Sequence, residues 1–178
     1  MTAHLFVDES FRSGRYLLTA AVVPPNRLRP LRTLVRSMLL PGQRELHMKL
    51  ESARRRRMVL DRLVAAQVQA RVYAAGCHER RQEAARAECL RRLLLDAVEE
   101  GAQRLVLDTR GPRDTHDVRT LQAAIGTRPS KSLLTYEHLD STHEALIGLA
   151  DFLGWAHGAG GEWRRRASPA ISAVIDCT

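Results

Sequence analysis

Short apolar runs with sharp polar boundaries open the chain. Residues 4–8 lead from three consecutive apolar side chains into carboxylates, and the apolar run of residues 16–23 stops at two prolines. Runs of this length, bounded by polar residues, glycine or proline, are typical of buried strands. A short turn at residues 11–14, which contains Gly14, separates the two runs. The pattern predicts an antiparallel hairpin whose first strand ends at Asp8.

Apolar residues recur at helical spacing over much of the remaining chain. This period predicts helices over residues 28–38, 52–64, 79–100, 114–125 and 142–157. Ser52 can cap the second helix, and Gly101 follows the end of the third. Short runs at residues 67–73, 105–108 and 132–136 predict three further strands, the first with one face in water. Residues 43–49 fit no regular element, and the tail at residues 158–178 is left without a structural assignment.

The order of these elements indicates the fold class. Helices alternate with strands after an initial hairpin, which is typical of an α/β fold with a mixed sheet flanked by helices. Right-handed crossovers would place the strand at residues 4–8 beside the strand at residues 105–108, in the middle of the sheet. With 178 residues, the chain is expected to form a single domain over residues 1–178.

The composition describes a globular protein with a strongly basic surface. Hydrophobic residues make up 44% of the chain and charged residues 27%, which argues against a disordered protein. The net charge is +8, and Lys49 and Lys131 are the only lysines among 28 basic residues. An arginine-rich surface favours nucleic-acid phosphates, although a GC-rich genome would produce the same bias. Since only 4% of residues are aromatic, we expect backbone contacts with duplex or structured nucleic acid rather than stacking on single strands.

The expected location is cytoplasmic. No apolar run approaches the ~18 residues of a membrane span, and no secretory signal is visible at the N-terminus. Cys77, Cys89 and Cys177 include no Cys-x-x-Cys pair, so reduced thiols are expected rather than a disulfide framework or a zinc site. The oligomeric state stays open.

Carboxylates at the ends and faces of predicted buried elements are the candidate chemistry. Asp8 and Asp108 end two strands that should be neighbours, and open α/β sheets bind ligands at such strand ends. Asp151 lies within an apolar helix, where Gly154 on the same face permits close approach to the sheet. A buried carboxylate needs a cation or a hydrogen-bond donor, and clustered carboxylates select hard cations such as Mg²⁺ or Mn²⁺. Two such ions could activate a water and stabilise the leaving oxygen in phosphodiester hydrolysis.

Each acid also has a simpler interpretation. Asp8 and Glu9 could cap a helix or a turn, and Asp108 could start a turn. Asp151 could pair with one of the many arginines. The joint pattern, rather than any single residue, favours a metal site.

Several short motifs together resemble the bacterial "domain of unknown function 3800" family, which is similar to the ribonuclease H-like superfamily. The motifs are Asp8-Glu9-Ser10, Glu45-Leu46-His47, Asp108 at a strand end, Asp140-Ser141 and the segment 148–154, so the match spans residues 4–157. The resemblance implies that two metal ions are held by the catalytic residues Asp8, Glu45, Asp108 and Asp151, with Asp8 bridging both ions. The chain departs from the family at Phe11, where glycine is usual, and at Gly148, where glutamine is usual. The first change reshapes the turn, and the second removes a polar group near the site.

Other residues around these motifs are secondary candidates: Glu9, Ser10, His47, Lys49, Asp140 and Ser141. His47 could move a proton or hold a phosphate, because histidine titrates near neutral pH, or it could cap a neighbouring helix. The run Arg54-Arg55-Arg56-Arg57 could bind substrate by following a phosphate backbone, or it could form a solvated helix face.

The sequence therefore favours a Mg²⁺- or Mn²⁺-dependent nuclease with a ribonuclease H-like fold that hydrolyses phosphodiester bonds of RNA or DNA. A non-catalytic module that binds nucleic acid or another partner on the same fold is the alternative, and the departures at Phe11 and Gly148 favour it. A phosphotransfer or recombination enzyme that uses the same metals is a third hypothesis. The sequence does not distinguish RNA from DNA, or endonuclease from exonuclease activity.

Overall fold

The first two strands form the predicted hairpin, but the first strand is longer than expected. In the computed structural model, which describes residues 3–126 and 134–177, β1 spans His4–Arg12 and β2 spans Arg15–Val23. Ser13 and Gly14 both have positive φ and form a two-residue turn that suits the twist of the flanking strands. Because this turn keeps the strands paired up to Arg12 and Arg15, the prediction that the first strand ends at Asp8 is wrong.

The described residues form one six-stranded mixed sheet with the order β5-β4-β1-β2-β3-β6. The remaining strands are β3 (Gln69–Gly76), β4 (Arg104–Asp108), β5 (Thr135–Leu139) and β6 (Ile171–Asp176). β2 runs antiparallel to both of its neighbours, whereas β4 pairs in parallel with β1 and β5, and β6 pairs in parallel with β3. The predicted pairing of β1 with the strand that contains Asp108 is therefore confirmed.

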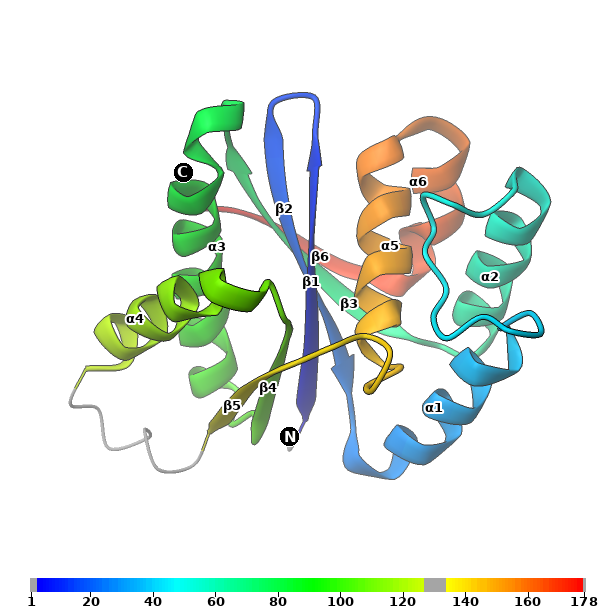
Figure 1. The fold of residues 1–178 in the computed structure, drawn as a ribbon, viewed down its shortest axis with the longest axis horizontal. Helices are drawn as coiled ribbons and strands as arrows, with labels where there is room; N and C mark the ends of the chain where they lie inside the picture. Colours follow the sequence, from blue (N-terminus) through cyan, green and yellow to red (C-terminus); the bar gives the residue numbers. More distant parts are fainter. Residues whose placement is uncertain (1–2, 127–133, 178) are drawn as a thin grey trace.

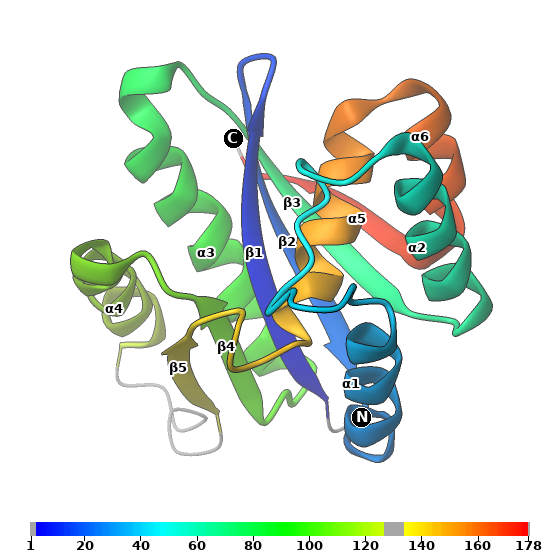
Figure 2. The same ribbon diagram turned by 45° about the vertical axis from the view of Figure 1, so that its right-hand side comes forward.

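Helices cover both faces of the sheet, as Figure 1 shows. They are α1 (Leu28–Ser37), α2 (Ala53–Ala65), α3 (Gln82–Glu99), α4 (Asp114–Ile125), α5 (Ile147–Ala159) and α6 (Gly161–Ala167). Short 3₁₀ turns occupy Pro25–Arg27, Glu79–Arg81, Gly111–Arg113 and Ser168–Ala170. α3 and α4 lie on one side, and α1, α2, α5 and α6 lie on the other (Figures 1 and 2). None of the described helices has the length and apolar character that a bilayer crossing requires.

Several predicted boundaries differ from the observed ones for local reasons. The helix predicted from residue 142 begins only at Ile147, because hydrogen bonds from the backbones of His143 and Glu144 to the carbonyl of Asp140 form turns first. β3 begins at Gln69 because Gln67 adopts a positive φ. The predicted wet face is confirmed at the start of the strand, where Gln67 and Gln69 are exposed and Arg71 is half-buried, but it ends at Tyr73, because residues 72–75 are all buried. Of the strand predicted at residues 132–136, residues 132 and 133 lie outside the described residues.

The unassigned tail completes the sheet. α6 follows α5 directly, and β6 then adds an edge strand beside β3. Half-buried and exposed residues alternate along β6, so the strand has only a weak apolar pattern. The strand predicted to be last, β5, instead forms the opposite edge of the sheet.

Candidate metal centre

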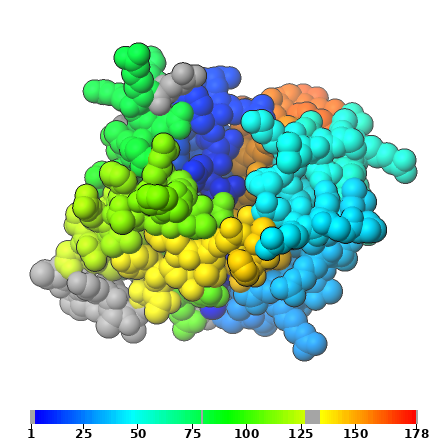
Figure 3. Space-filling view, in the orientation of Figure 1, coloured from blue at the N-terminus to red at the C-terminus, as the bar shows by residue number. Residues whose placement is uncertain are grey.

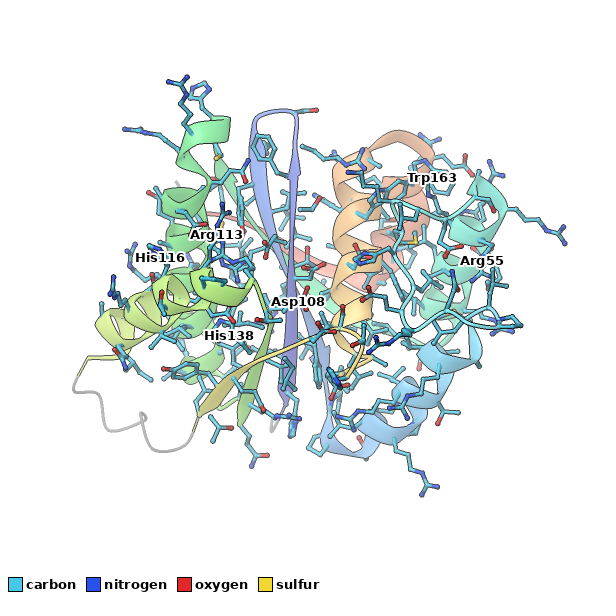
Figure 4. The ribbon with its side chains drawn as sticks, in the orientation of Figure 1. Arg55, Asp108, Arg113, His116, His138 and Trp163 are labelled. Carbon is cyan, nitrogen blue, oxygen red and sulfur yellow. The ribbon has the colours of Figure 1, made fainter. Side chains whose placement is uncertain are left out.

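Four acidic residues from separate segments line one cavity of about 300 Å³. Asp8 comes from the middle of β1, Asp108 from the end of β4, Asp151 from α5 and Glu45 from the loop between α1 and α2. Figure 3 shows β1 in blue at the floor of a hollow between the yellow-green α4 region and the cyan α1–α2 loop. Figure 4 places the labelled Asp108 beside β1. We call this space the carboxylate cavity.

Alternation along the two central strands places Asp8 and Asp108 on the same face of the sheet. Phe6 and Val106 pack in the core on the α5 side, whereas the intervening residues Leu5, Val7, Leu105 and Leu107 pack on the α3 side. Side chains two positions apart share a face, so both aspartates lie on the α5 side. The parallel pairing of β1 with β4 ends one residue before each aspartate. Both carboxylates therefore lie where these strands separate.

A glycine brings α5 close enough to complete the cavity. A Cβ atom at Gly154 would lie 2.5 Å from Thr19 Oγ1 on β2, so a larger residue would push the helix away from the sheet. Asp151 lies three positions earlier and shares this helix face. The predicted close approach at Gly154 is confirmed.

The four carboxylates have few partners. The backbone N–H of Glu9 donates to Asp8 Oδ1 at 2.7 Å, and that of Met48 donates to Asp151 Oδ2 at 3.1 Å. The Ser141 hydroxyl donates to Glu45. Within residues 3–126 and 134–177, His47 pairs with Glu45 and Asp151, and no arginine or lysine pairs with any of the four acids. The alternative in which Asp151 is neutralised by an arginine is therefore not what the structure shows.

Burial and neighbouring negative charges raise the pKa values of two of the acids. Burial raises the pKa of Asp8 well above its usual range, and the charges of Asp151, Glu9 and Asp108 raise it further. Burial likewise raises the pKa of Asp108 to about 6, with smaller contributions from Glu9 and Asp140. Both shifts report negative charge that lacks compensation. A divalent cation with all-oxygen ligands would supply that compensation, so the donor set fits Mg²⁺ or Mn²⁺.

His47 lies between two of the acids. Its Nδ1 is 3.7 Å from Asp151 Oδ2, and its Nε2 is 3.4 Å from Glu45 Oε1. A hydrogen bond with Asp151, with the charges of Asp151, Glu45 and Asp8, raises the pKa of His47 to about 9. The histidine is therefore protonated at neutral pH and acts as a counter-charge for the cavity.

Arginines of α2 hold the α1–α2 loop that carries Glu45 and His47. Arg56 donates to the carbonyls of Met48 and Lys49 at 2.7 and 2.8 Å, and its guanidinium stacks 4.4 Å from the Trp155 ring centroid. Arg55 donates to Glu51 and to the carbonyl of Met38. Each of these bonds fixes the loop to α2.

These contacts bear on the predicted substrate-binding run Arg54–Arg57. Arg55 and Arg56 hold the loop, and Arg57 pairs with Glu162 on α6 at 2.7 Å. Only Arg54 is exposed without an ion-pair partner among the described residues. A role of the run in substrate binding stays a prediction. The contacts of Arg55, Arg56 and Arg57 with the α1–α2 loop and with α6 stabilise the fold.

Glu9 lies on the opposite face of the sheet from Asp8. Its carboxylate pairs with Arg86 of α3, whose side chain is only 2% exposed. Arg86 also contacts the Tyr16 hydroxyl and forms a bidentate pair with Asp117 at 2.8 and 2.7 Å. Arg86 lies between alanines on the buried face of α3, and this position could have indicated a buried charge. The sequence analysis did not identify it.

A second acidic group surrounds this arginine. Asp114, Asp117 and His138 place potential ligand atoms within 4.8 Å of one another, and this group includes none of the acids of the carboxylate cavity. Burial raises the pKa of Asp117, but hydrogen bonds from Arg86 and His138 outweigh it and hold that pKa well below its usual range. Arg110 also donates to Asp117 at 3.0 Å. Two guanidinium groups already neutralise this cluster, which makes it a poorer cation site than the carboxylate cavity.

The other secondary candidates divide between two locations. Ser10 and Lys49 line a groove of about 680 Å³ that adjoins the carboxylate cavity and shares Asp8, Asp108 and Asp151 with it. Ser141 lies in the cavity itself. Asp140 is exposed, and its carboxylate accepts hydrogen bonds from the backbone and hydroxyl of Thr142, so its contacts stabilise a turn.

Comparison with known proteins identifies the fold. No family model matches the chain, and no curated protein matches it. Among solved structures, the chain is similar to one in the PCNA:RNase HII complex from Archaeoglobus fulgidus, with a TM-score of 0.52 and 16% sequence identity. The match covers 89% of this chain and 73% of the other. The predicted ribonuclease H-like fold, a mixed sheet flanked by helices in a single α/β domain, is therefore confirmed.

Proposed function

We propose that the protein is a divalent-metal-dependent nuclease that hydrolyses phosphodiester bonds of RNA or DNA. One observation carries this proposal: four carboxylates from distant segments meet in a cavity at the strand ends without an arginine or lysine partner among the described residues. The chain has 28 basic residues, so an uncompensated acidic group on such a molecule favours a ligand that is itself a cation. The likeness to a chain of an RNase HII complex supports the same function.

The residues of the cavity have distinct roles in this proposal. Asp8, Glu45, Asp108 and Asp151 would hold the Mg²⁺ or Mn²⁺ ions of a two-metal site. When bound, such ions activate a water and stabilise the leaving oxygen of a phosphodiester. His47 is half-exposed beside Glu45 and Asp151, where its protonated imidazole can donate a proton. Ser141 orients Glu45 through its hydroxyl.

The finer assignments belong to the same proposal. Membership of the "domain of unknown function 3800" family accounts for the order of the four acids along the chain. Nucleic acid is the proposed partner, with duplex or structured forms preferred because aromatic residues are scarce at 4%. A cytoplasmic location is consistent with the free cysteines, of which Cys77 and Cys89 are buried.

The test is a cleavage assay on labelled RNA, DNA and hybrid duplexes with Mg²⁺, with Mn²⁺ and with EDTA. We expect metal-dependent cleavage by the wild type, and none by Asp8→Asn or Asp151→Asn. Asp61→Asn, which changes an exposed acid paired with Arg166, should cleave like the wild type and controls for contaminating nucleases. Equal cleavage by all four proteins would refute the assigned site. Salt-sensitive nucleic-acid binding without any cleavage would instead support the non-catalytic module.

A further inference from the structure

A groove of about 340 Å³ lies on the far side of the β1–β2 hairpin from the carboxylate cavity. Its charged and polar lining comes from the hairpin residues Arg12, Ser13 and Arg15 and from His157 and Arg164 near the α5–α6 junction. The groove that adjoins the carboxylate cavity also contains Arg12 and Ser13. The two grooves therefore meet at the tip of the hairpin, where Arg12 and Ser13 line both of them. We call the groove of about 340 Å³ the arginine groove.

Arg12 and Arg164 in this groove are held in place by contacts other than an ion pair with a carboxylate. The Arg12 guanidinium lies 5.2 Å from the Trp155 ring centroid, and its aliphatic stem runs beside Gly158, where an added Cβ would be 3.5 Å from Arg12 Cδ. Arg164 Nε donates to the carbonyl of His157 at 2.8 Å. Among the described residues, neither arginine forms an ion pair. Both side chains are thus held by one contact while donor groups stay available for an anion.

Other arginines in the structure do form ion pairs with carboxylates. Arg32, Arg57, Arg86 and Arg104 each pair with a glutamate or an aspartate. No acidic side chain is among the described residues that line the arginine groove, although Arg15 pairs with Asp176 at 3.7 Å. Burial lowers the pKa of His157, and the charges of Arg164 and Arg15 lower it further. A positive groove that begins at an acidic, cation-binding centre suits a ligand with several phosphates in series.

We infer that a nucleic-acid strand whose reacting phosphate lies at the carboxylate cavity continues along β1 and places further phosphates on Arg12 and Arg164. This inference rests on the proposed function for the position of the reacting phosphate. Arg12 lies four positions after Asp8 in β1, which is roughly 13 Å along the strand at about 3.3 Å per residue. Along a duplex, that distance corresponds to roughly four nucleotides per strand.

The experiment measures binding rather than cleavage. Each variant is made in an Asp108→Asn background, and its affinity for a fluorescein-labelled 20-base-pair DNA or RNA duplex is measured by anisotropy across a series of salt concentrations. Arg12→Ala with Arg164→Ala should reduce the magnitude of the log–log salt slope by about 1.8 and weaken binding at least about tenfold near 0.1 M salt. Arg29→Ala with Arg91→Ala removes the same charge from exposed positions on α1 and α3, and should change the slope by less than about 0.5.

Further variants separate charge from folding. Arg12→Lys with Arg164→Lys keeps both charges and should restore most of the slope. Arg164→Ala alone changes an exposed side chain and should remove about 0.9 of slope even if substitution of Arg12 disturbs packing on Trp155. Equal slopes for the groove variant and its charge-matched control would overturn the inference, as would a lysine variant as weak as the alanine variant.

The outcome is distinguishable from failure of the proposed function. If the wild type cleaves with metal but the groove substitutions leave the salt slope unchanged, only the inference fails. If the groove substitutions reduce the slope but the wild type never cleaves, the binding track stands and the nuclease proposal fails. If the parent protein binds neither duplex at any salt concentration, both are refuted.

Discussion

The adjacent acids Asp8 and Glu9 have opposite surroundings because a strand alternates its side chains between two faces. Asp8 faces other carboxylates and has a raised pKa, whereas Glu9 faces the buried Arg86. The same separation holds at the end of β4, where Asp108 falls on the Asp8 side. A single-residue shift in register would exchange these roles, so the pairing of β1 with β4 determines which acids can hold a cation.

Replacing Asp108 should stabilise the metal-free protein. The folded-state pKa of about 6 lies above the usual value of 3.8, so the folded protein binds this proton more tightly and loses stability as pH rises through that interval. In EDTA at neutral pH, Asp108→Asn should therefore raise the free energy of unfolding by about 1 to 3 kcal/mol, or the Tm by ~2 to 8 °C. Thermal denaturation followed by circular dichroism measures this.

A matched substitution with the opposite expectation is Asp140→Asn. Hydrogen bonds from Thr142 lower the pKa of Asp140, so its charge stabilises the fold, and its replacement should leave the Tm unchanged or lower it. A fall in Tm for Asp108→Asn in EDTA would contradict the proposed repulsion within the cavity.

His47 should make the stability of the metal-free protein depend on alkaline pH. Its pKa of about 9 exceeds the usual 6.5, so its stabilising effect is complete below about pH 6.5 and is lost as pH rises through 9. In EDTA, the Tm of the wild type should fall more steeply between about pH 7 and pH 9.5 than that of His47→Gln. His143→Gln, at a histidine 75% exposed, should follow the wild type. Parallel curves for all three proteins would show that His47 does not compensate the acids.

At the scale of elements, the position of α5 depends on one glycine. Gly154→Ala adds a methyl group 2.5 Å from Thr19 Oγ1, and overpacking of this kind costs about 1 to 3 kcal/mol, more than the gain of up to ~1 kcal/mol in helix propensity. We expect a net loss of stability in urea denaturation. Thr19 Oγ1 is buried without a hydrogen-bond partner among the described residues, so Thr19→Ala alone should be nearly neutral and should recover part of the loss in the double variant. Additive losses would contradict the contact.

The α1–α2 loop should depend on Arg56 in a similar way. Arg56→Ala removes two hydrogen bonds to loop carbonyls and the stacking on Trp155, which frees the segment that carries Glu45 and His47. Isothermal titration with Mn²⁺ should show weaker binding by about 10- to 100-fold, the range typical of lost support around metal ligands. Arg57→Ala breaks an exposed pair with Glu162 and should bind Mn²⁺ like the wild type. Equal Mn²⁺ affinities for Arg56→Ala and Arg57→Ala would show that Arg56 does not position the metal ligands.

The elements themselves were predictable to different extents, for physical reasons. β1, β2 and β4 have continuous apolar runs because the sheet centre is covered on both sides, and Gly154 revealed the close approach of α5. β6 was missed because an edge strand that is half exposed carries little apolar signal. The hairpin was predicted, but its turn was assigned to residues 11–14, whereas the turn consists of Ser13 and Gly14 and β1 stays paired up to Arg12.

At the scale of the whole molecule, the distribution of charge carries the functional argument. Asp8, Asp108 and Asp151 could be proposed from sequence because each ends or interrupts an apolar element, whereas Glu45 was proposed from the family resemblance. That no arginine pairs with these acids among the described residues depends on tertiary contacts. The Arg54–Arg57 run shows the converse: a cluster that suggests phosphate binding is used mainly to hold the α1–α2 loop and α6. Arg12 and Arg164, which are far apart in sequence, instead lie in one groove.

The last prediction concerns how the whole protein responds to metal. A cation that binds only the folded state should raise the free energy of unfolding by mass action, by about 2.7 kcal/mol at a concentration 100 times the Kd. For a chain of this size, that gain raises the Tm by roughly 5 to 10 °C. Because protons compete at Asp8 and at Asp108, whose pKa is about 6, the gain should be large at about pH 8 and small at about pH 5.5. Differential scanning calorimetry with Mg²⁺, Mn²⁺ or EDTA measures it.

Two variants make this response specific to the carboxylate cavity. Asp8→Asn should lose the metal-induced gain at both pH values, whereas Asp114→Asn, in the group near Arg86, should keep it. If Asp114→Asn lost the gain and Asp8→Asn kept it, the metal would bind at Asp114, Asp117 and His138 instead. A gain of equal size at both pH values would show that the ion binds at carboxylates with ordinary pKa values, and thus outside the cavity in which burial raises the pKa values of Asp8 and Asp108.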